Sequence, residues 1–266
     1  MALSWLALVI GNSRLHWAWF IDSRLKQTWD TPHLSTEAVT TLIAQQFNFH
    51  QLSLTVASEH GELFPHLPYP LPLWIASVVP SQTMLWQSYP HTHYLTLDQI
   101  PLQALYPTLG VDRALALWGA ICTERSPALV IDAGTALTLT GADADAKLVG
   151  GAILPGLGLQ LRSLTEHTAA LPGISRLSAT PLTRWATNTP EAMVSGIIYS
   201  LVAGIEDFVQ DWRQQFPDST IVLTGGDGAT LYHYWQQQHP ETATLVKVDA
   251  NLVFWGVRAV LEKSAL

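Results

Sequence analysis

The stretch Leu129-Val130-Ile131-Asp132-Ala133-Gly134-Thr135-Ala136-Leu137-Thr138-Leu139 carries one carboxylate near the end of an apolar strand, before a tight turn and a second strand. A buried strand has no structural use for Asp132, because an unpaired carboxylate away from water is costly. Gly134 lets the backbone turn sharply and lets an anion approach the N–H groups, and Thr135 adds a hydroxyl. These features predict a hairpin that binds phosphate and positions a cation.

A similar hairpin opens the chain. The apolar residues 6–10 run into Gly11-Asn12-Ser13, and a second apolar run follows at 15–20. Two such hairpins in one chain predict two lobes that close on one nucleotide. We expect an N-terminal lobe at 1–124 and a C-terminal lobe at 125–266.

The composition predicts a chain with a sizeable core and an anionic surface. Of the 266 residues, 48% are hydrophobic, and the net charge is −8. Nucleic acid is not an expected partner, because its phosphates attract basic surfaces. The single cysteine, Cys122, excludes an internal disulfide and fits the cytoplasm, and we interpret it as a small buried hydrophobe. No basic segment marks a signal peptide, and no run of about 18 apolar residues predicts a membrane span.

Hydrophobic periodicity predicts an α/β protein. Strands are expected at 3–10, 15–21, 24–30, 52–58, 73–78, 148–153 and 221–224, besides the hairpin at 129–139; helices are expected at 36–48, 80–89, 111–123, 157–169, 190–214 and 251–263. The helix at 190–214 has the clearest start signals. Thr189 is the expected N-cap, Pro190 the first helical residue and Glu191 an acidic residue in the first turn.

Three further motifs place glycines where a ligand could approach the backbone. Gly110-Val111-Asp112-Arg113 opens a helix, Gly150–Gly156 is an apolar glycine-rich segment, and Gly225-Gly226-Asp227-Gly228 joins a strand to a helix. Taken singly, Asp112 is better explained by the helix dipole, and Arg113 by a surface ion pair.

Together and in this order, the motifs resemble type III pantothenate kinases of the actin-like and sugar-kinase ATPase superfamily. The resemblance covers nearly the whole chain and is carried by Gly110–Arg113, Asp132–Ala136, Gly150–Gly156, Asn188–Ala192 and Thr224–Asp227. It implies a two-lobed, ribonuclease H-like α/β fold in which each lobe is a mixed sheet flanked by helices. The implied reaction is ATP-dependent phosphorylation of pantothenate to 4'-phosphopantothenate, the first step of coenzyme A biosynthesis.

The resemblance also implies roles for individual residues. Asp112 matches the base that takes the proton of the substrate hydroxyl, and Arg113 would hold the pantothenate carboxylate or the transferring phosphoryl. Asp132 matches the ligand of a monovalent cation, K⁺ or NH₄⁺, and Thr135 matches an ATP contact. The other expected contacts are Val9, Ile10, Gly11, Asn12, Ser13, Arg14, Leu15 and His16 for ATP with Mg²⁺, and Tyr106, Gly110, Val111 and Thr189 for pantothenate.

Two positions depart from the family pattern. The family's first hairpin reads Asp-x-Gly-Asn-Thr, whereas Val9 stands at the Asp position and cannot bind a metal. Asn12 is retained and Ser13 keeps the hydroxyl of the family's Thr, so the phosphate-binding turn can persist, while metal positioning would depend on ATP, water and Asp132. Tyr106 lies closer to the Gly-x-Asp-Arg motif than the family's tyrosine does, so it is the equivalent residue only if the intervening loop is shortened.

Other interpretations stay open. Val9 keeps open a non-catalytic, nucleotide- or pantothenate-binding regulator of the same fold, and a kinase of another small hydroxyl compound is a further alternative. His91 and His93 share a strand face but have no third ligand at a telling spacing, so exposed histidines are the favoured interpretation.

A homodimer with a shared active site is also expected. The resemblance supplies one reason, and the helix at 190–214 supplies another, because its apolar arc is broader than one packing stripe requires. The arc and its neighbours are Ile197, Ile198, Tyr199, Leu201, Val202, Trp185 and Trp212. Such a surface, exposed in a monomer, would mark an interaction site. Alternatively, the helix is central to its own lobe.

Overall fold

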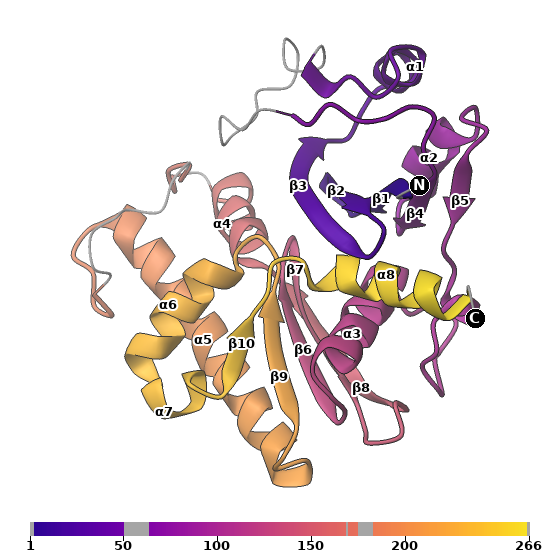
Figure 1. Ribbon diagram of the computed structural model, residues 1–266. Coiled ribbons are helices and arrows are strands. Elements are labelled where there is room, and N and C mark those ends of the chain that lie inside the picture. Colours follow the sequence, from indigo (N-terminus) through magenta and orange to yellow (C-terminus); the bar gives the residue numbers. More distant parts are fainter. Residues whose placement is uncertain (1–2, 51–63, 169, 175–182, 265–266) are drawn as a thin grey trace. The chain divides into compact units, whose positions relative to one another are not determined.

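The structure is a computed structural model that describes residues 3–50, 64–168, 170–174 and 183–264 (Figure 1). The strand expected at 52–58 lies outside these residues. The chain forms two compact units: unit 1 contains residues 1–101, 105–119 and 253–266, and unit 2 contains 102–104 and 120–252. The lobe boundary at 124/125 stays a prediction, but the C-terminal helix, expected in the second lobe, packs in unit 1.

Unit 1 contains a five-stranded mixed sheet in the order β3-β2-β1-β4-β5. The strands are β1 (Ser4–Ile10), β2 (Arg14–Ile21), β3 (Arg24–Pro32), β4 (Leu73–Ser77) and β5 (Thr92–Tyr94). Strands β1, β2 and β3 pair antiparallel, while β1 pairs in parallel with β4, and β4 with β5. The predicted meander and the strand at 73–78 are confirmed, whereas β5 is too short to show a period in the sequence.

The helices of unit 1 lie on both faces of this sheet. They are α1 (Thr36–Ala44), α2 (Pro80–Thr83), the 3-10 helices η2 (Met84–Trp86) and η3 (Leu97–Gln99), α3 (Val111–Thr123), which continues into unit 2, and α8 (Leu252–Ser264). Leu6, Leu8 and Ile10 of β1 face an aromatic core. The opposite face carries Phe20, whose ring lies 6.2 Å from that of Trp255 in α8.

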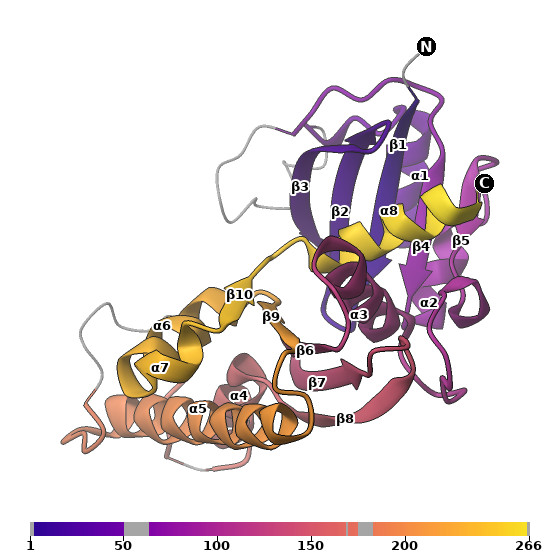
Figure 2. The same cartoon turned by 60° about the horizontal axis from the view of Figure 1, so that its bottom comes forward.

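Helix α8 crosses α3 so closely that the backbones of the two helices are in contact (Figure 2). A Cβ atom on Gly256 would overlap the carbonyl of Leu115. Only a glycine allows this approach, which adds to the contact of Trp255 with Phe20 in holding the last helix within unit 1. Cys122, near the end of α3, is exposed, so the prediction that it is buried is wrong.

Unit 2 repeats the architecture of unit 1. Its sheet has the order β10-β9-β6-β7-β8, with β6 (Ala128–Ala133), β7 (Ala136–Ala142), β8 (Leu148–Pro155), β9 (Thr220–Thr224) and β10 (Val246–Val248). The first strand, β6, is central: it pairs antiparallel with β7 and in parallel with β9, as β1 does with β2 and β4. The helices are α4 (Leu157–Glu166), α5 (Thr189–Gln215), α6 (Gly228–Gln238) and α7 (Pro240–Ala243). The duplicated topology is the expected actin-like α/β fold.

Helix α5 is the core helix of unit 2. Ile197, Ile198, Leu201 and Val202 are buried in the core of this unit. These residues of the arc are therefore covered within one chain, so the premise of the dimer is wrong for them; Tyr199 is half-buried and Trp185, before the helix, is 87% exposed, and the dimer itself stays a prediction. Of the helices in the described part of the chain, α5 alone is long and apolar enough to span a membrane by length and composition, and 56% of its apolar window is buried.

The start of α5 differs from the prediction by one residue. Asn188 is the N-cap, and its side chain accepts a hydrogen bond from the Glu191 backbone N–H at 3.0 Å. Thr189 is the first helical residue. Asn and Thr both serve as N-caps, so the run Asn-Thr-Pro-Glu did not distinguish them. Thr189 is thus not needed for capping.

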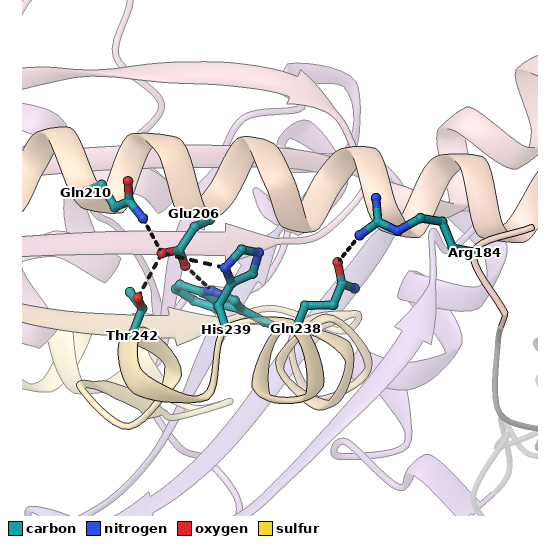
Figure 3. A network of polar contacts seen from close by, with 7 residues as sticks. Arg184, Glu206, Gln210, Gln238, His239 and Thr242 are labelled. Atoms are coloured by element: carbon teal, nitrogen blue, oxygen red, sulfur yellow. Dashed lines mark hydrogen bonds and ion pairs between the residues drawn. The ribbon is translucent and has the colours of Figure 1, made fainter.

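A buried carboxylate joins three helices of unit 2 (Figure 3). Glu206 of α5 accepts hydrogen bonds from Trp235 Nε1 at 2.6 Å, Thr242 Oγ1 at 2.8 Å and Gln210 Nε2 at 2.7 Å. Burial acts to raise the pKa of Glu206, but these hydrogen bonds and the charge of His239, 3.9 Å away, outweigh it and hold the pKa below its usual value. The carboxylate therefore stabilises the packing of α5, α6 and α7 in its ionised form.

Candidate active site

In unit 1, a glycine turn joins β1 to β2. The Gly11 N–H donates to the Arg14 carbonyl at 3.0 Å, and the strands pair Val9 with His16. Val9 is buried. The predicted turn is thus present in unit 1, with an apolar side chain at the end of its first strand.

Two histidines lie beside this turn. His16 Nδ1 is 2.8 Å from Asp30 Oδ1 on β3, and His16 Nε2 lies 3.6 Å from where a Cβ on Gly11 would be. His33 Nε2 is 2.8 Å from the Gly11 carbonyl oxygen. Neither Asp30 nor His33 belongs to a motif that the sequence makes recognisable. The register of the three-stranded meander points to Asp30, because His16 on β2 lies between Val9 on β1 and Asp30 on β3.

Asp112 lies in the first turn of α3. Its Oδ1 accepts a hydrogen bond from the Arg113 backbone N–H at 2.8 Å, and a Cβ on Gly110 would lie 2.5 Å from the same oxygen. Burial raises the pKa of Asp112 above its ordinary value, although the Arg113 N–H and the charges of Arg113 and His16 oppose this effect. A carboxylate with a raised pKa holds an abstracted proton more strongly, as a general base requires.

Arg113 is buried beside Asp112, with 9% of the residue exposed. Its Nη1 donates a hydrogen bond to the Tyr106 hydroxyl at 3.1 Å. The loop between them contains a tight turn, in which the Leu109 N–H donates a hydrogen bond to the Tyr106 carbonyl at 3.0 Å. Asp112, Arg113 and Tyr106 therefore form one polar cluster in unit 1.

In unit 2, the predicted hairpin joins β6 to β7 around Asp132. The Gly134 N–H donates to the Ala136 carbonyl at 3.1 Å, and Asp132 pairs with Thr138 of β7 and Thr224 of β9. Thr135 lies in the turn between the two strands. The carboxylate thus stands near the end of the central strand of this unit.

Glycines let other segments approach this hairpin. Gly225 has a φ of +91°, and a Cβ there would lie 2.5 Å from Asp132 Oδ1. A Cβ on Gly156 would overlap the Gly134 carbonyl. The ends of the two glycine-rich segments recognised in the sequence therefore meet at the Asp132 hairpin.

The donor set at this end of unit 2 fits a hard cation. A Cβ on Gly225 would lie 2.5 Å from Asp132 Oδ1 and 2.6 Å from the Ala133 carbonyl oxygen, so these two oxygens are neighbours, and oxygen ligands suit alkali and alkaline-earth ions. The described residues contain no group of three or more His, Cys, Asp or Glu that could hold a metal. A cation here would therefore depend on Asp132, carbonyls and water. His93, the other metal candidate, stacks on Trp74 with ring centroids 4.4 Å apart.

Thr189, the remaining candidate, belongs to helix α5 of unit 2. It is exposed at the first position of α5, in unit 2. Each unit can thus be assigned its own chemistry: unit 1 holds a desolvated carboxylate with a buried guanidinium, and unit 2 holds a carboxylate among glycine turns.

Comparison with known proteins identifies relatives along the whole chain. A family model described as type III pantothenate kinase matches residues 5–211. A type III pantothenate kinase from a Nostoc species is 50% identical over 264 residues, which cover 97% of this chain and 94% of that protein. A type III pantothenate kinase from a Synechocystis species is 44% identical over 257 residues, covering 96% and 90%.

Solved structures support the fold. A crystal structure described as a conserved putative Baf family transcriptional activator from Campylobacter jejuni has a TM-score of 0.62 at 19% identity and covers 98% of both chains. The ethanolamine utilization protein EutJ from Carboxydothermus hydrogenoformans has a TM-score of 0.50 at 9% identity, covering 96% of this chain and 89% of that chain. At these identities the likeness concerns the fold alone.

Proposed function

This chain belongs to the type III pantothenate kinase family, and we propose that it phosphorylates pantothenate with Asp112 as the general base. The enzyme is an ATP-dependent transferase, and the product, 4'-phosphopantothenate, enters coenzyme A biosynthesis. The observation that carries the assignment of the base is the environment of Asp112, whose carboxylate is desolvated and held at the start of α3.

The substrate hydroxyl is a weak acid, so it must lose its proton as the phosphoryl group arrives. Asp112 accepts that proton. The buried guanidinium of Arg113 holds the pantothenate carboxylate or the transferring phosphoryl through charge-assisted hydrogen bonds. The Tyr106 hydroxyl, at 3.1 Å, restricts the guanidinium to one orientation and is a further candidate for substrate contact.

ATP enters with Mg²⁺, as in kinases generally, and its phosphates need N–H and hydroxyl donors. The turn from Gly11 to Ser13 and the Thr135 turn supply such groups, one in each unit. Asp132 holds K⁺ or NH₄⁺, which offsets phosphate charge. The fit of its carboxylate and neighbouring carbonyls to a hard cation supports this role.

The test is an assay of the purified full chain with ATP, Mg²⁺, K⁺ and pantothenate. Asp112→Asn keeps the size of the side chain but removes the proton acceptor, so we expect turnover to fall by at least about 10²-fold with an unchanged circular dichroism spectrum. His91→Gln, an exposed change in the same unit, is the control. Near-normal turnover of Asp112→Asn would refute the base.

The same assay separates the alternatives. Wild-type protein that binds ATP but transfers no phosphoryl group to any small alcohol would be a non-catalytic regulator. Transfer to another hydroxyl compound, but not to pantothenate, would identify a kinase of different specificity.

We also propose that the enzyme works in the cytoplasm as a homodimer, without a nucleic-acid or membrane partner. The support is family membership, together with an acidic chain whose longest apolar helix is a core helix. Light scattering on active protein tests the dimer, since a mass near the 29.2 kDa of one chain would exclude it. Activity regained on mixing inactive Asp112 and Thr189 variants would indicate a site shared between protomers.

A further inference from the structure

The loop that follows β4 contacts two functional segments of unit 1 through Val78. The Val78 N–H donates a hydrogen bond to the Ile10 carbonyl at 3.1 Å, and Ile10 is the last residue of β1 before the glycine turn. The Val78 side chain lies at the start of α3, since a Cβ on Gly110 would be 3.5 Å from Val78 Cγ1. Asp112 stands in the first turn of that helix. One residue therefore meets both the end of β1 and the helix that carries the proposed base.

Gly110 has an apolar group and a carboxylate oxygen as close neighbours. The point where its Cβ would stand is 2.5 Å from Asp112 Oδ1 and 3.5 Å from Val78 Cγ1. The valine methyl group is thus placed where it excludes water from one side of the carboxylate. Loss of water around a carboxylate disfavours its charged form, in agreement with the raised pKa of Asp112.

The charged groups around Asp112 act in the opposite direction. Arg113 follows it on α3, and His16 lies on β2, and the charges of both lower the pKa of the Asp112 carboxyl group. The Tyr106 hydroxyl accepts a hydrogen bond from Arg113 Nη1 at 3.1 Å. Val78 carries no charge, so its effect on Asp112 is confined to position and desolvation.

Two hydroxyl groups hold the backbone around Val78. Ser77 Oγ accepts a hydrogen bond from the Val79 N–H at 3.1 Å and lies 3.3 Å from the Val79 carbonyl oxygen. Thr83 Oγ1 is 2.6 Å from Ser77 Oγ and 3.0 Å from the same carbonyl oxygen. A hydroxyl group has one proton to donate, so when Thr83 donates to Ser77, Ser77 can donate to the carbonyl. Thr83 thus completes a closed set of hydrogen bonds around the residue that follows Val78.

Val79 anchors the same loop in the core. Its side chain packs against the aromatic core of unit 1, while the neighbouring Val78 side chain lies against Gly110. Val79 is also the N-cap residue of α2 and has no side chain that could cap the helix. The hydrogen bond between Thr83 and Ser77 supplies the polar support that a capping side chain would otherwise give. The loop that presents Val78 is therefore held by both apolar and polar contacts.

We propose that Val78 is a positioning residue of the kinase, which shields and orients the Asp112 carboxylate, and that the hydrogen bond between Thr83 and Ser77 keeps Val78 in place. This inference rests on the proposed kinase function. A base that is held in one orientation reaches the substrate hydroxyl without a further loss of freedom. Shielding from water also makes the carboxylate a stronger proton acceptor.

The first experiment compares Val78→Thr and Val78→Ile with wild type in the pantothenate kinase assay across a range of pH. Val78→Thr places a hydroxyl group beside the carboxylate, which weakens its desolvation and lowers the pKa of Asp112. We therefore expect the acid limb of kcat/KM for pantothenate, which reports the base in the free enzyme, to move to lower pH by about 0.5 pH unit. We expect kcat to fall by about 10-fold, with little change in the KM for ATP. Val78→Ile keeps both Cγ atoms and should keep the wild-type profile.

Thr83 offers a matched pair of variants. Thr83→Val keeps the shape of the side chain but loses the hydroxyl group, whereas Thr83→Ser keeps the hydroxyl group and loses the methyl group. We expect Thr83→Val to lower kcat by about 3-fold, the scale of one net hydrogen bond, and to shift the acid limb in the same direction as Val78→Thr. Thr83→Ser should resemble wild type. Equal behaviour of the two variants would refute the role of the Thr83 hydroxyl.

Val149→Thr, the same exchange at a position of unit 2 that is 48% exposed, is the control and should leave the acid limb unchanged. NMR titration of the Asp112 carboxyl group gives a second readout that does not need turnover, and a lower pKa in Val78→Thr is the expected result. An acid limb and an NMR titration that are the same in Val78→Thr and wild type would overturn the inference, even if the variant unfolds at a lower urea concentration. Wild-type protein that transfers no phosphoryl group to pantothenate would instead refute the proposed function, and the NMR titration would then still test the shielding of Asp112.

Discussion

The two hairpins have the same topology but different side chains at equivalent positions. In unit 2, Asp132 stands two residues before the turn glycine of the central strand, and in unit 1 that position is Val9. The turns differ as well, because Gly134 bonds to a residue two positions on, and Gly11 to one three positions on. The two hairpins therefore share a backbone topology that ends in a glycine turn, but only the second has a carboxylate, that of Asp132, on its first strand.

The hairpins also differ in how closely they are packed. The Asp132 hairpin is touched by backbone at Gly156 and Gly225, whereas a Cβ on Gly11 would make only ordinary contacts, the nearest at 3.5 Å. The second hairpin is thus a closed arrangement of glycine turns. The first is open on the side where His16 and His33 lie.

The largest expected effect comes from removing the Asp132 carboxylate, which has no counterpart on the central strand of unit 1. Asp132→Ala should lower turnover by about 10²-fold, because a cation near the phosphates loses its charged ligand. Wild-type rates should be higher in K⁺ or NH₄⁺ than in Na⁺ buffer, and the variant should lose this difference. Asp145→Ala, an exposed change in the same unit, is the control. Equal wild-type rates in Na⁺ and K⁺ would contradict the cation role.

The next effect tests the difference in packing. Gly156→Ala should destabilise the protein by about 3 kcal/mol, since the new methyl group overlaps backbone that cannot move aside. Gly11→Ala should change the free energy of unfolding by less than about 1 kcal/mol, because its φ is not positive and the new methyl group would make only ordinary van der Waals contacts. Urea unfolding of both variants measures the contrast. Similar losses at the two glycines would remove the distinction between a closed and an open hairpin.

Much of the fold follows from the sequence because long elements carry a clear period. The meander, α3 and α5 were predicted almost to the residue. The strands β5 and β10, with three residues each, are too short to carry a period. Helix α8 joins unit 1 through distant contacts, such as Trp255 with Phe20 and Gly256 with Leu115, which no local pattern encodes.

The candidate site divides in the same way. Asp112, Arg113 and Asp132 lie in compact motifs, so the sequence alone singles them out. Asp30 and His33 become visible only through strand register and through a contact with the Gly11 carbonyl across 22 residues. The exposed patch predicted on α5 failed for a related reason, because a helix that is apolar over a wide arc is equally typical of a core helix.

The smallest expected effect concerns the interiors of the units. The core of unit 1 is built on aromatic rings, whereas unit 2 buries the ionised Glu206 among Trp235, Thr242 and Gln210. Glu206→Gln should lower the free energy of unfolding by about 2 kcal/mol at neutral pH, the scale of hydrogen bonds to a charged group.

The pH dependence of that effect gives the sharper test. The pKa of Glu206 is lowered in the folded protein, so its contribution is present above the ordinary value of 4.5 and is lost as the pH falls through the folded-state pKa. The gap between wild type and Glu206→Gln should therefore be widest near neutral pH and should shrink in acid. Asp207→Asn, an exposed neighbour on the same helix, should show neither the loss nor the pH dependence. Urea unfolding at neutral and at acid pH measures both, and a constant gap would mean that the carboxylate contributes shape rather than charge to the core of unit 2.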